Sequence, residues 1–572
     1  TLDFAREQGI AVLPRGGGTS QCGQTVNHAV VIDASKHLNR ILELDVEGRR
    51  CLVEPGIVLD ELNRQLKPHG LWFPVDVSTS SRATIGGMAG NNSCGGRSIR
   101  YGMMRDNVTA IDTILSDGST ARFGDVASIS PSGLLKELQP RLLAMGETHG
   151  ADILDGFPKV LRRVGGYNVD ALIPDAMGMR PGGLPGDGIN LSHLLVGSEG
   201  TLAYSTAIEL KLWPLPAKKI MGICHFPTFY QAMDAAQHLV TLDPVAVELV
   251  DDTMIELARS IPIFQPTVEE AVRGNPAALL LVEFAEEDMA ENERRLRQLH
   301  EMMGDLGFGW DKDVAWRGGV VDAIDPGMQG RIAEWRKSGL NIMMSEKSEA
   351  KPVSFLEDCA VELKDLAEYT DKLTAIFDRN GVKGTWYAHA SVGCLHVRPV
   401  LNMKQAGGAE TMRAIAEEAF ELVRSFGGSH SGEHGDGIVR SEFNDRMFGP
   451  VLPDLFRQVK AMFDPQGMFN PGKITDAPKM DDRELFRFAP GYEAEDFDSV
   501  LDWAAWPGAA GGFQGAVEMC NNNGACRKLS GGVMCPSYRA THNERDAVRG
   551  RANSLRLAMS GQLGPGAMAS DE

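Results

Sequence analysis

The stretch Pro14-Arg15-Gly16-Gly17-Gly18-Thr19-Ser20 follows the short apolar segment Ile10–Leu13, which the residue pattern predicts to be a β-strand. Three consecutive glycines allow the backbone to adopt positive φ values and to approach a ligand closely. Successive backbone N–H groups in such a loop form a concave anion site that suits a pyrophosphate. The hydroxyl pair that follows supplies further donors. A tight turn without a ligand is the alternative, and the loop alone does not decide between the two.

Two further glycine-rich loops favour the ligand. Residues 83–96 combine glycines with the amide pair Asn91-Asn92, and Leu195–Leu202 repeats the order of strand, glycine and hydroxyl. Neither loop matches the G-x-G-x-x-G fingerprint or a P-loop ending in Gly-Lys-Ser/Thr. The sequence therefore predicts a phosphate-bearing cofactor outside the two commonest nucleotide-binding folds.

Four blocks in this order, residues 14–20, 74–80, 85–101 and 197–202, resemble the FAD-binding domain of the vanillyl-alcohol-oxidase and p-cresol-methylhydroxylase (PCMH) superfamily. The resemblance covers about residues 8–216 and implies two α/β subdomains with FAD between them. No residue clearly matches the His or Cys that attaches FAD covalently in some relatives, so we expect non-covalent FAD. The motif Asn470-Pro471-Gly472-Lys473 resembles the segment that returns to the flavin. The cofactor-binding residues implied by the resemblance are Pro14, Arg15, Gly16, Gly17, Gly18, Thr19, Ser20, Pro74, Asp76, Ser78, Gly86, Gly87, Asn91, Ser93, Gly197, Gly200, Thr201 and Asn470.

Histidines and a glutamate gather in a second region. His389 and His396 are seven residues apart, a spacing that would place them on opposite faces of one straight strand. Gly393 allows a turn between them, so the two imidazoles can converge. Residues 429–437 (Ser-His-Ser-Gly-Glu-His-Gly-Asp-Gly) then add a carboxylate and further imidazoles between glycines. Two His and one Glu suit a divalent metal of zinc or manganese type, although single histidines are more often satisfied core residues.

This region resembles the C-terminal substrate domain of FAD-linked D-2-hydroxyacid dehydrogenases. The resemblance implies that His389, His396 and Glu433 bind the metal and that His434 is the general base. The sequence departs from the commoner form His-x-Gly-Asp-Gly-Asn-x-His at Ser391, Val392 and Cys394, whereas both histidines and Gly393 are kept.

Two cations stand where these relatives bind the substrate carboxylate, namely Arg336 and Lys351. Each taken alone could be an ordinary surface charge. The resemblance implies oxidation of a D-2-hydroxy acid, with D-lactate or D-2-hydroxyglutarate favoured, to the 2-oxo acid. An alcohol oxidase of the same superfamily that uses O2, a reductase that uses NADPH and a non-catalytic FAD-binding scaffold are the alternatives.

Three of the nine cysteines, Cys520, Cys526 and Cys535, lie within sixteen residues near the end of the chain. With the following Pro536 they resemble the ferredoxin-like module that is fused to some of these dehydrogenases. The resemblance implies a 4Fe-4S cluster in a longer parent protein, with electrons passing to a quinone, a cytochrome or a flavoprotein. Three thiolates cannot complete a four-thiolate site, so a zinc knuckle or free thiols stay open as alternatives.

The composition excludes some classes of partner. The formal net charge of −20 leaves no basic stripe for nucleic acid. No apolar run approaches the roughly 18 to 20 residues of a spanning helix, so we expect no transmembrane segment. The scattered remaining cysteines favour a reducing compartment, so we expect a cytoplasmic protein, with peripheral contact at the inner face of the membrane left open. The chain begins at Thr1 within an expected helix, so we also expect the true N-terminus to be missing.

The distribution of elements predicts an α+β fold in four parts. Residues 1–216 would form the two-subdomain PCMH-type FAD-binding domain and 217–475 a substrate domain with helices over an antiparallel sheet. Residues 476–510 would be a linker and 511–572 a partial iron–sulfur module with helices. Within the first part we expect a helix over 132–148, a surface loop over 177–188, and a strand–glycine–strand unit over 194–203.

Overall fold

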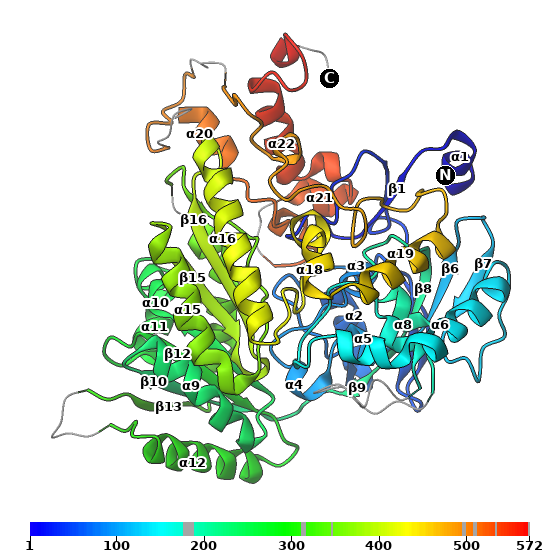
Figure 1. Cartoon of the computed structure of the whole chain (residues 1–572). Helices are drawn as coiled ribbons and strands as arrows, with labels where there is room; N and C mark the ends of the chain where they lie inside the picture. Colours follow the sequence, from blue (N-terminus) through cyan, green and yellow to red (C-terminus); the bar gives the residue numbers. More distant parts are fainter. Residues whose placement is uncertain are drawn as a thin grey trace.

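The computed structural model describes residues 1–174, 188–310, 316–344, 347–494, 499–506, 512–531 and 535–569. The loop expected at 177–188 lies, except for Gly188, outside these residues. Figure 1 shows two lobes side by side, with the C-terminal segment packed across one end of both. Helices and antiparallel sheets make up each lobe, so the predicted α+β fold is confirmed.

The first lobe is built on a five-stranded antiparallel sheet. Its strands, in order across the sheet, are β3 (Ile41–Asp45), β4 (Arg50–Val53), β8 (Tyr204–Lys211), β6 (Val108–Ile114) and β7 (Thr120–Phe123). A separate parallel pair, β1 (Val12–Arg15) and β2 (Val30–Asp33), carries the first glycine loop at the end of β1. Helix α2 (Leu59–Leu66) buries Leu59, Leu62 and Leu66, one face of a 3.6-residue period, against this lobe. The helix expected over 132–148 is α6 (Leu135–Gly156).

The strand–glycine–strand expectation for residues 194–203 is wrong. Helix α8 (Ser192–Leu195) ends there, and no strand begins before Tyr204. Gly197, Glu199 and Gly200 all have positive φ values, which a strand does not allow. The N–H groups of Gly197 and Glu199 instead donate to the carbonyls of Ala89 and Gly90, each at 2.8 Å. The loop thereby caps α3 (Ile85–Asn91), which carries the second glycine loop.

The second lobe is a seven-stranded sheet whose paired strands are all antiparallel. Their order is β13 (Gly319–Ala323), β10 (Ile220–Phe226), β12 (Ala278–Phe284), β11 (Ala246–Asp251), β15 (Gly384–His389), β16 (Cys394–Leu401) and β14 (Lys351–Pro352). Every residue of β10, β11 and β12 is buried, because helices cover both faces.

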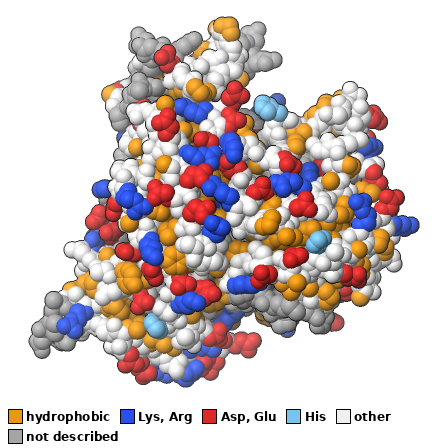
Figure 2. Space-filling view, viewed as in Figure 1, with side chains coloured by type: hydrophobic (Ala, Val, Ile, Leu, Met, Phe, Trp, Pro, Cys, Tyr) orange, Lys and Arg blue, Asp and Glu red, His pale blue; other side chains and the backbone are white. Residues whose placement is uncertain are grey.

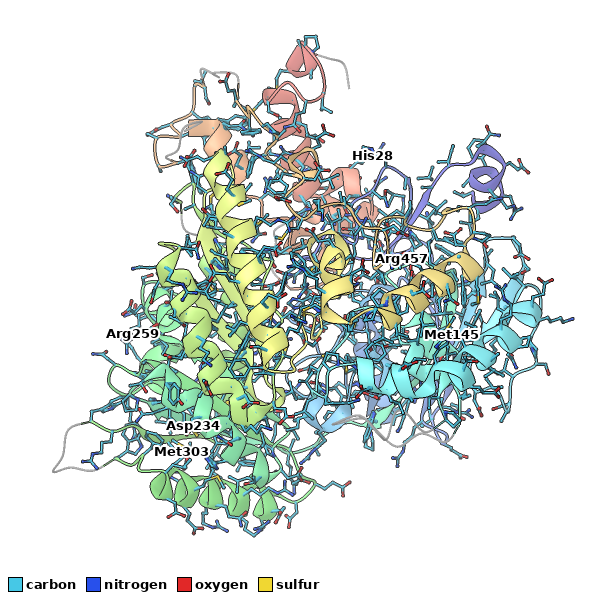
Figure 3. All side chains as sticks on the ribbon, in the orientation of Figure 1. His28, Met145, Asp234, Arg259, Met303 and Arg457 are labelled. Atoms are coloured by element: carbon cyan, nitrogen blue, oxygen red, sulfur yellow. The ribbon has the colours of Figure 1, made fainter. Side chains whose placement is uncertain are left out.

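The two faces of this sheet pack against different helices. One face meets α9 (Phe229–Leu239), α12 (Met289–Asp305), α15 (Leu366–Arg379) and α16 (Ala406–Ser425), and α15 lies between α9 and α16 in Figure 1. The other face meets α10 (Asp252–Arg259), α11 (Gln265–Ala271) and α13 (Pro326–Lys337). The core on the first face continues into the first lobe, as the buried Met145 of α6 and Met303 of α12 illustrate (Figure 3).

The surface seen in Figure 2 mixes charges of both signs over α16 and its neighbours. Ion pairs such as Arg413–Glu442 and Arg446–Glu417 join α16 to the residues that follow it. Within the described ranges, no helix combines the length and the apolar character needed to cross a membrane.

His225 in β10 is expected to make the stability of the second lobe depend on pH. Its ring is fully buried, Nδ1 lies 2.9 Å from the Ile223 carbonyl, and Nε2 accepts the Arg273 N–H at 3.1 Å. Only the neutral ring can accept that N–H. Burial accordingly lowers the pKa of His225 to about 4. Between the ordinary histidine pKa of about 6.5 and pH 4, His225 binds a proton in the unfolded chain but not in the folded chain. The stabilisation is therefore complete above pH 6.5 and is lost as the pH falls toward 4.

We expect the stability advantage of the wild type over His225→Gln to shrink by about 2 kcal/mol between pH 7.5 and pH 5. Urea unfolding of both proteins at the two pH values measures this difference. An advantage that is independent of pH would contradict the neutral buried imidazole.

Candidate functional site

A cavity of about 370 Å³ lies where the two lobes meet. Its wall includes, from the first lobe, these residues singled out in the sequence: Pro14, Arg15, Gly16, Gly17, Gly18, Thr19, Ser20, Asp76, Ser78, Gly86, Gly87, Asn91, Ser93 and Gly200. From the second lobe it includes Arg336, His389, His396, Glu433 and His434. The glycine loops and the histidine cluster therefore share one cavity.

Four of the implied cofactor residues, Pro74, Gly197, Thr201 and Asn470, are not among the residues that line this cavity. Asn470 donates to the carbonyls of Gln24 at 3.1 Å and Glu199 at 2.9 Å, and so joins two loops. The Thr201 hydroxyl lies 2.7 Å from that of Tyr167. The side chains of Asn470 and Thr201 therefore stabilise the loops and do not line the cavity.

Lys351 is also absent from the cavity wall. Its ammonium lies 3.4 Å from the Met519 sulfur, in the C-terminal segment. Of the two cations implied for the substrate carboxylate, the structure thus brings only Arg336 to the histidines.

The first glycine loop is glycine-rich partly because of protein packing. A Cβ at Gly16 would lie 2.1 Å from Thr84 Oγ1, and one at Gly17 would lie 2.4 Å from the Arg82 carbonyl. Any side chain at either position would force the loop away from α3. The close approach inferred from the sequence is therefore, at these two positions, an approach to the protein itself.

The two predicted histidine ligands lie on one hairpin. β15 ends at His389, Gly393 has φ +68, and β16 begins at Cys394. In the strand register His389 pairs with Cys394, which places His389 and His396 diagonally on the same face. Their rings are 4.9 Å apart. The turn expected at Gly393 is present, and it is what allows an odd spacing to bring the imidazoles together.

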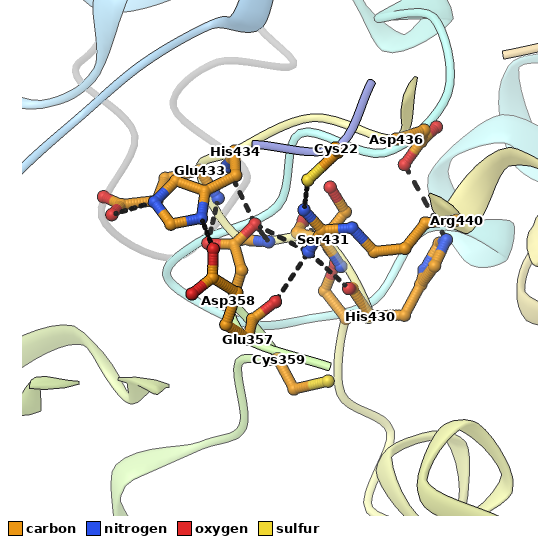
Figure 4. Close-up of polar contacts among 12 residues, drawn as sticks. Cys22, Glu357, Asp358, Cys359, His430, Ser431, Glu433, His434, Asp436 and Arg440 are labelled. Atoms are coloured by element: carbon orange, nitrogen blue, oxygen red, sulfur yellow. Dashed lines mark hydrogen bonds and ion pairs between the residues drawn. The ribbon is translucent and has the colours of Figure 1, made fainter. Parts of the chain in front are cut away.

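The loop that carries Glu433 and His434 is held by the buried carboxylate of Asp358 (Figure 4). Asp358 accepts the N–H groups of Gly432 at 3.0 Å, Glu433 at 2.7 Å and His434 at 2.8 Å. Arg440 pairs with the same carboxylate at 3.1 Å. Asp358 thereby shapes the loop, and its carboxylate also lies within 4.8 Å of ligand atoms of His396, Glu433 and His434.

Three imidazole nitrogens converge on one carboxylate oxygen. Nε2 of His389, His396 and His434 lie 3.3, 3.0 and 3.2 Å from Glu433 Oε1. Ligand atoms that share a metal at about 2.1 Å are separated by about 3.0 to 3.4 Å. Two imidazoles and a carboxylate at this spacing therefore fit the predicted divalent metal. His430, by contrast, turns away and lies 3.0 Å from Asn444 Oδ1.

His434 lies between two carboxylates. Its Nδ1 is 3.1 Å from Glu357 Oε1, and its Nε2 faces Glu433. Although burial lowers it, the negative charges of Asp358 and Glu357 hold the pKa of His434 well above its usual range. Burial raises the pKa of Glu433, but the positive charges of His389 and His396 outweigh burial and hold it well below its usual range. Contact with the buried Glu357 at Nδ1 thus orients the ring so that Nε2 lies on the side of Glu433.

Glu248 connects the predicted carboxylate-binding cation to the predicted metal ligands. It stands directly opposite His389 in the pairing of β11 with β15. Its carboxylate lies 2.9 and 3.0 Å from His389 Nδ1, and it forms an ion pair with Arg336. Arg336 Nε is buried and has no hydrogen-bond partner in the described part of the chain, so an N–H stays available for a ligand.

The sequence reading missed Glu248, Glu357 and Asp358. A sequence signal existed for Glu248, since it is a single acid inside the apolar run Val245–Val250. A buried charge in a strand needs a partner, and so marks a site. The Glu357-Asp358 pair gives no comparable signal, because acid pairs are common on surfaces.

Two family models match the chain. The model described as FAD binding domain matches residues 1–124, and that described as FAD linked oxidases, C-terminal domain, matches residues 215–474. The chain therefore carries both of these domains of FAD-linked oxidases. The resemblance found in the sequence is thereby confirmed, and both halves of the cavity belong to matched regions.

Among curated relatives of this chain are proteins named D-2-hydroxyglutarate dehydrogenase. Those of Pantoea ananatis and Escherichia coli are each 32% identical, with 96% of this chain covered. The matches cover 52% and 53% of those proteins, so the chain spans about half the length of these relatives. A protein of Archaeoglobus fulgidus named D-lactate dehydrogenase is 27% identical, with 83% of this chain and 88% of that protein covered.

Solved structures share the fold. A structure of p-cresol methylhydroxylase has a TM-score of 0.55 at 13% identity, covering 83% of this chain and 86% of that one. A 4-ethylphenol oxidase from Gulosibacter chungangensis has a TM-score of 0.56 at 13% identity, covering 83% and 87%. At this identity the likeness shows the PCMH-type fold alone.

Proposed function

We propose that this chain is the FAD-containing part of a longer dehydrogenase that oxidises a D-2-hydroxy acid to the 2-oxo acid. One observation carries the proposal, namely that the glycine loop and the imidazole–carboxylate cluster line the same cavity. The names of the relatives support the substrate class, with D-2-hydroxyglutarate or D-lactate as the favoured acid. A non-catalytic scaffold would not need this cluster.

FAD would be held without a covalent bond along the first-lobe wall, with its pyrophosphate at Arg15–Thr19. When bound, FAD supplies the acceptor for the hydride that leaves C2 of the substrate. A divalent metal, of zinc or manganese type, would be held by His389, His396 and Glu433. When bound, it supplies a Lewis acid next to the substrate hydroxyl.

The chain's own residues would orient the substrate and move its proton. Arg336 would hold the substrate carboxylate through its unpartnered Nε–H, with Glu248 fixing the guanidinium from the other side. His434 would take the hydroxyl proton at Nε2 in its neutral form, which a bound divalent cation would favour by offsetting the carboxylate charges that raise the pKa of the ring. Lys351 remains a candidate only if the contact with Met519 changes.

The electrons would leave through a 4Fe-4S cluster in the longer protein, with Cys520, Cys526 and Cys535 as ligands. Cys526 and Cys535 share a small core with Tyr538 and Ala547. Cys520, Cys526 and Cys535 are the three cysteines of this sequence that follow Cys394, so a four-thiolate cluster would need a fourth ligand from elsewhere. We propose a quinone, cytochrome or flavoprotein acceptor and a cytoplasmic location, with room for peripheral contact at the membrane.

The test of the proposed function is turnover of the purified, FAD-containing chain with an artificial one-electron acceptor and a panel of D- and L-2-hydroxy acids. We expect reduction of the acceptor with at least one D-acid and none with its L-enantiomer. Turnover only with simple alcohols, coupled to O2 consumption, would instead support the alcohol oxidase.

Replacement of Arg336 by Lys should raise KM about tenfold or more and change kcat little. A lysine keeps the charge but lacks the Nε–H that would hold the substrate carboxylate while Glu248 fixes the rest of the guanidinium, a loss of about 1.5 to 3 kcal/mol. Arg331→Lys on the same helix, where the exposed side chain pairs with Glu270, is the matched control. An unchanged KM in Arg336→Lys would remove this residue from the substrate site.

A further inference from the structure

The C-terminal segment that carries the cysteines packs on the glycine loop of the first lobe. Figure 1 shows α21 (Pro536–Thr541) next to the region of β1, with α22 (Val548–Met559) beyond it. Two arginines make the contact, Arg527 and Arg549, and each is only 3% exposed. Burial of a guanidinium group is unfavourable unless the group is hydrogen-bonded. The burial of both arginines therefore indicates specific contacts between the segment and the loop.

Both arginines donate to carbonyl oxygens of the glycine loop. Arg527 reaches the Gly17 carbonyl at 2.6 Å and the Gly16 carbonyl at 3.3 Å. Arg549 reaches the Gly18 carbonyl at 2.7 Å and the Gly17 carbonyl at 3.2 Å. The carbonyls of three consecutive glycines are thus all turned toward the C-terminal segment.

This arrangement determines where the loop's N–H groups point. In a planar trans peptide the C=O and the N–H point in opposite directions. With the Gly16, Gly17 and Gly18 carbonyls turned to the arginines, the N–H groups of the following residues, up to Thr19, turn toward the other side. None of these N–H groups donates a hydrogen bond to a described residue. Free N–H groups in succession are the basis of an anion site.

The charges around the loop also favour an anion. Arg15 and Arg82 stand near Arg549, and Arg15 Nε is buried without a hydrogen-bond partner in the described structure. Burial and the charge of Arg549 together lower the pKa of Arg82 to about 10. Two carboxylates offset part of this positive charge, namely Glu544, which pairs with Arg549 at 2.7 Å, and Asp33, which lies 3.6 Å from Arg527. Four guanidinium groups therefore gather around a loop that lines the cavity.

We propose that Arg527 and Arg549 complete the site for the pyrophosphate of FAD, so that docking of the cysteine segment fixes the loop that holds the cofactor. This inference rests on the proposed use of FAD. Both residues are positioning residues, because they act through the loop carbonyls. The segment thereby has a role in cofactor retention that is independent of any metal bound to its cysteines.

The experiment compares the wild type with Arg527→Met and Arg549→Met, and with Arg545→Met as the matched control. Arg545 lies in the same segment, but its side chain is 82% exposed and pairs only with the adjacent Asp546. Each apoprotein is titrated with FAD and, separately, with riboflavin, which has the same flavin ring but no pyrophosphate. Flavin fluorescence gives the dissociation constants.

We expect the Kd for FAD to rise at least tenfold in Arg527→Met and in Arg549→Met, with Arg549→Lys recovering part of the loss. The Kd for riboflavin and both constants of the control should stay within about twofold of the wild type. Equal weakening of FAD and riboflavin would show general damage and overturn the inference, as would unchanged FAD binding. A wild type that binds no FAD would instead overturn the proposed function itself.

Discussion

Replacement of Glu433 by Gln is expected to remove the metal and to slow flavin reduction by at least about 10³-fold. The Glu433 carboxylate is the point on which three imidazole nitrogens converge, at 3.0 to 3.3 Å. A neutral amide binds a divalent cation far more weakly and presents an N–H where a lone pair is needed. Loss of metal removes several kcal/mol of transition-state stabilisation, and each 1.36 kcal/mol is a factor of ten in rate. Metal content and anaerobic stopped-flow reduction measure the two effects.

The matched control for Glu433→Gln is Glu410→Gln, an exposed carboxylate on α16. It should keep the metal content, the FAD content and the rate of the wild type. If Glu433→Gln keeps its metal and reacts at the wild-type rate, the metal site has been placed on the wrong residues.

Replacement of His434 by Gln should leave FAD and metal bound but lower the rate of flavin reduction by substrate about 10²- to 10⁴-fold. The ring is oriented by Glu357 at 3.1 Å with Nε2 on the side of Glu433, where it can take the hydroxyl proton. An amide can occupy the same volume and accept a hydrogen bond, but it cannot take up the proton. Stopped-flow absorbance under argon follows the rate, and elemental analysis follows the metal.

The comparison variant for His434→Gln is His430→Gln. His430 belongs to the same loop, yet it faces Asn444, and a glutamine can keep a hydrogen bond to that amide. We expect it to react like the wild type. Loss of metal in His434→Gln would show that His434 is a ligand, and an unchanged rate would show that it is not the base.

The sequence allowed prediction of the parts of the site that depend on local chemistry. Glycines, hydroxyls and amides in the loops at 14–20 and 83–96 are needed locally, and these loops do line the cavity. The turn at Gly393 could also be predicted, because it is the only way to bring His389 and His396 onto one face. These features depend on a few neighbouring residues.

The parts that the sequence did not reveal depend on distant pairings. Glu248 meets His389 only because β11 pairs with β15 in one register, and no local pattern fixes that register. Lys351 was placed by family position, but packing of the C-terminal segment brings Met519 to its ammonium. For residues 194–203 we expected a strand–glycine–strand unit, whereas the positive φ values at Gly197, Glu199 and Gly200 produce a capping loop. Tertiary contacts outweighed the local preference there.

The most direct test of the central claim is anaerobic bleaching of the bound flavin by D- and L-2-hydroxy acids, with and without a metal chelator. We predict that one D-acid bleaches the flavin, that its L-enantiomer does not, and that chelation abolishes the reaction while FAD stays bound. Bound FAD that no hydroxy acid reduces, or that is reduced equally well after the metal has been removed, would contradict the proposed cooperation of the two lobes at this cavity.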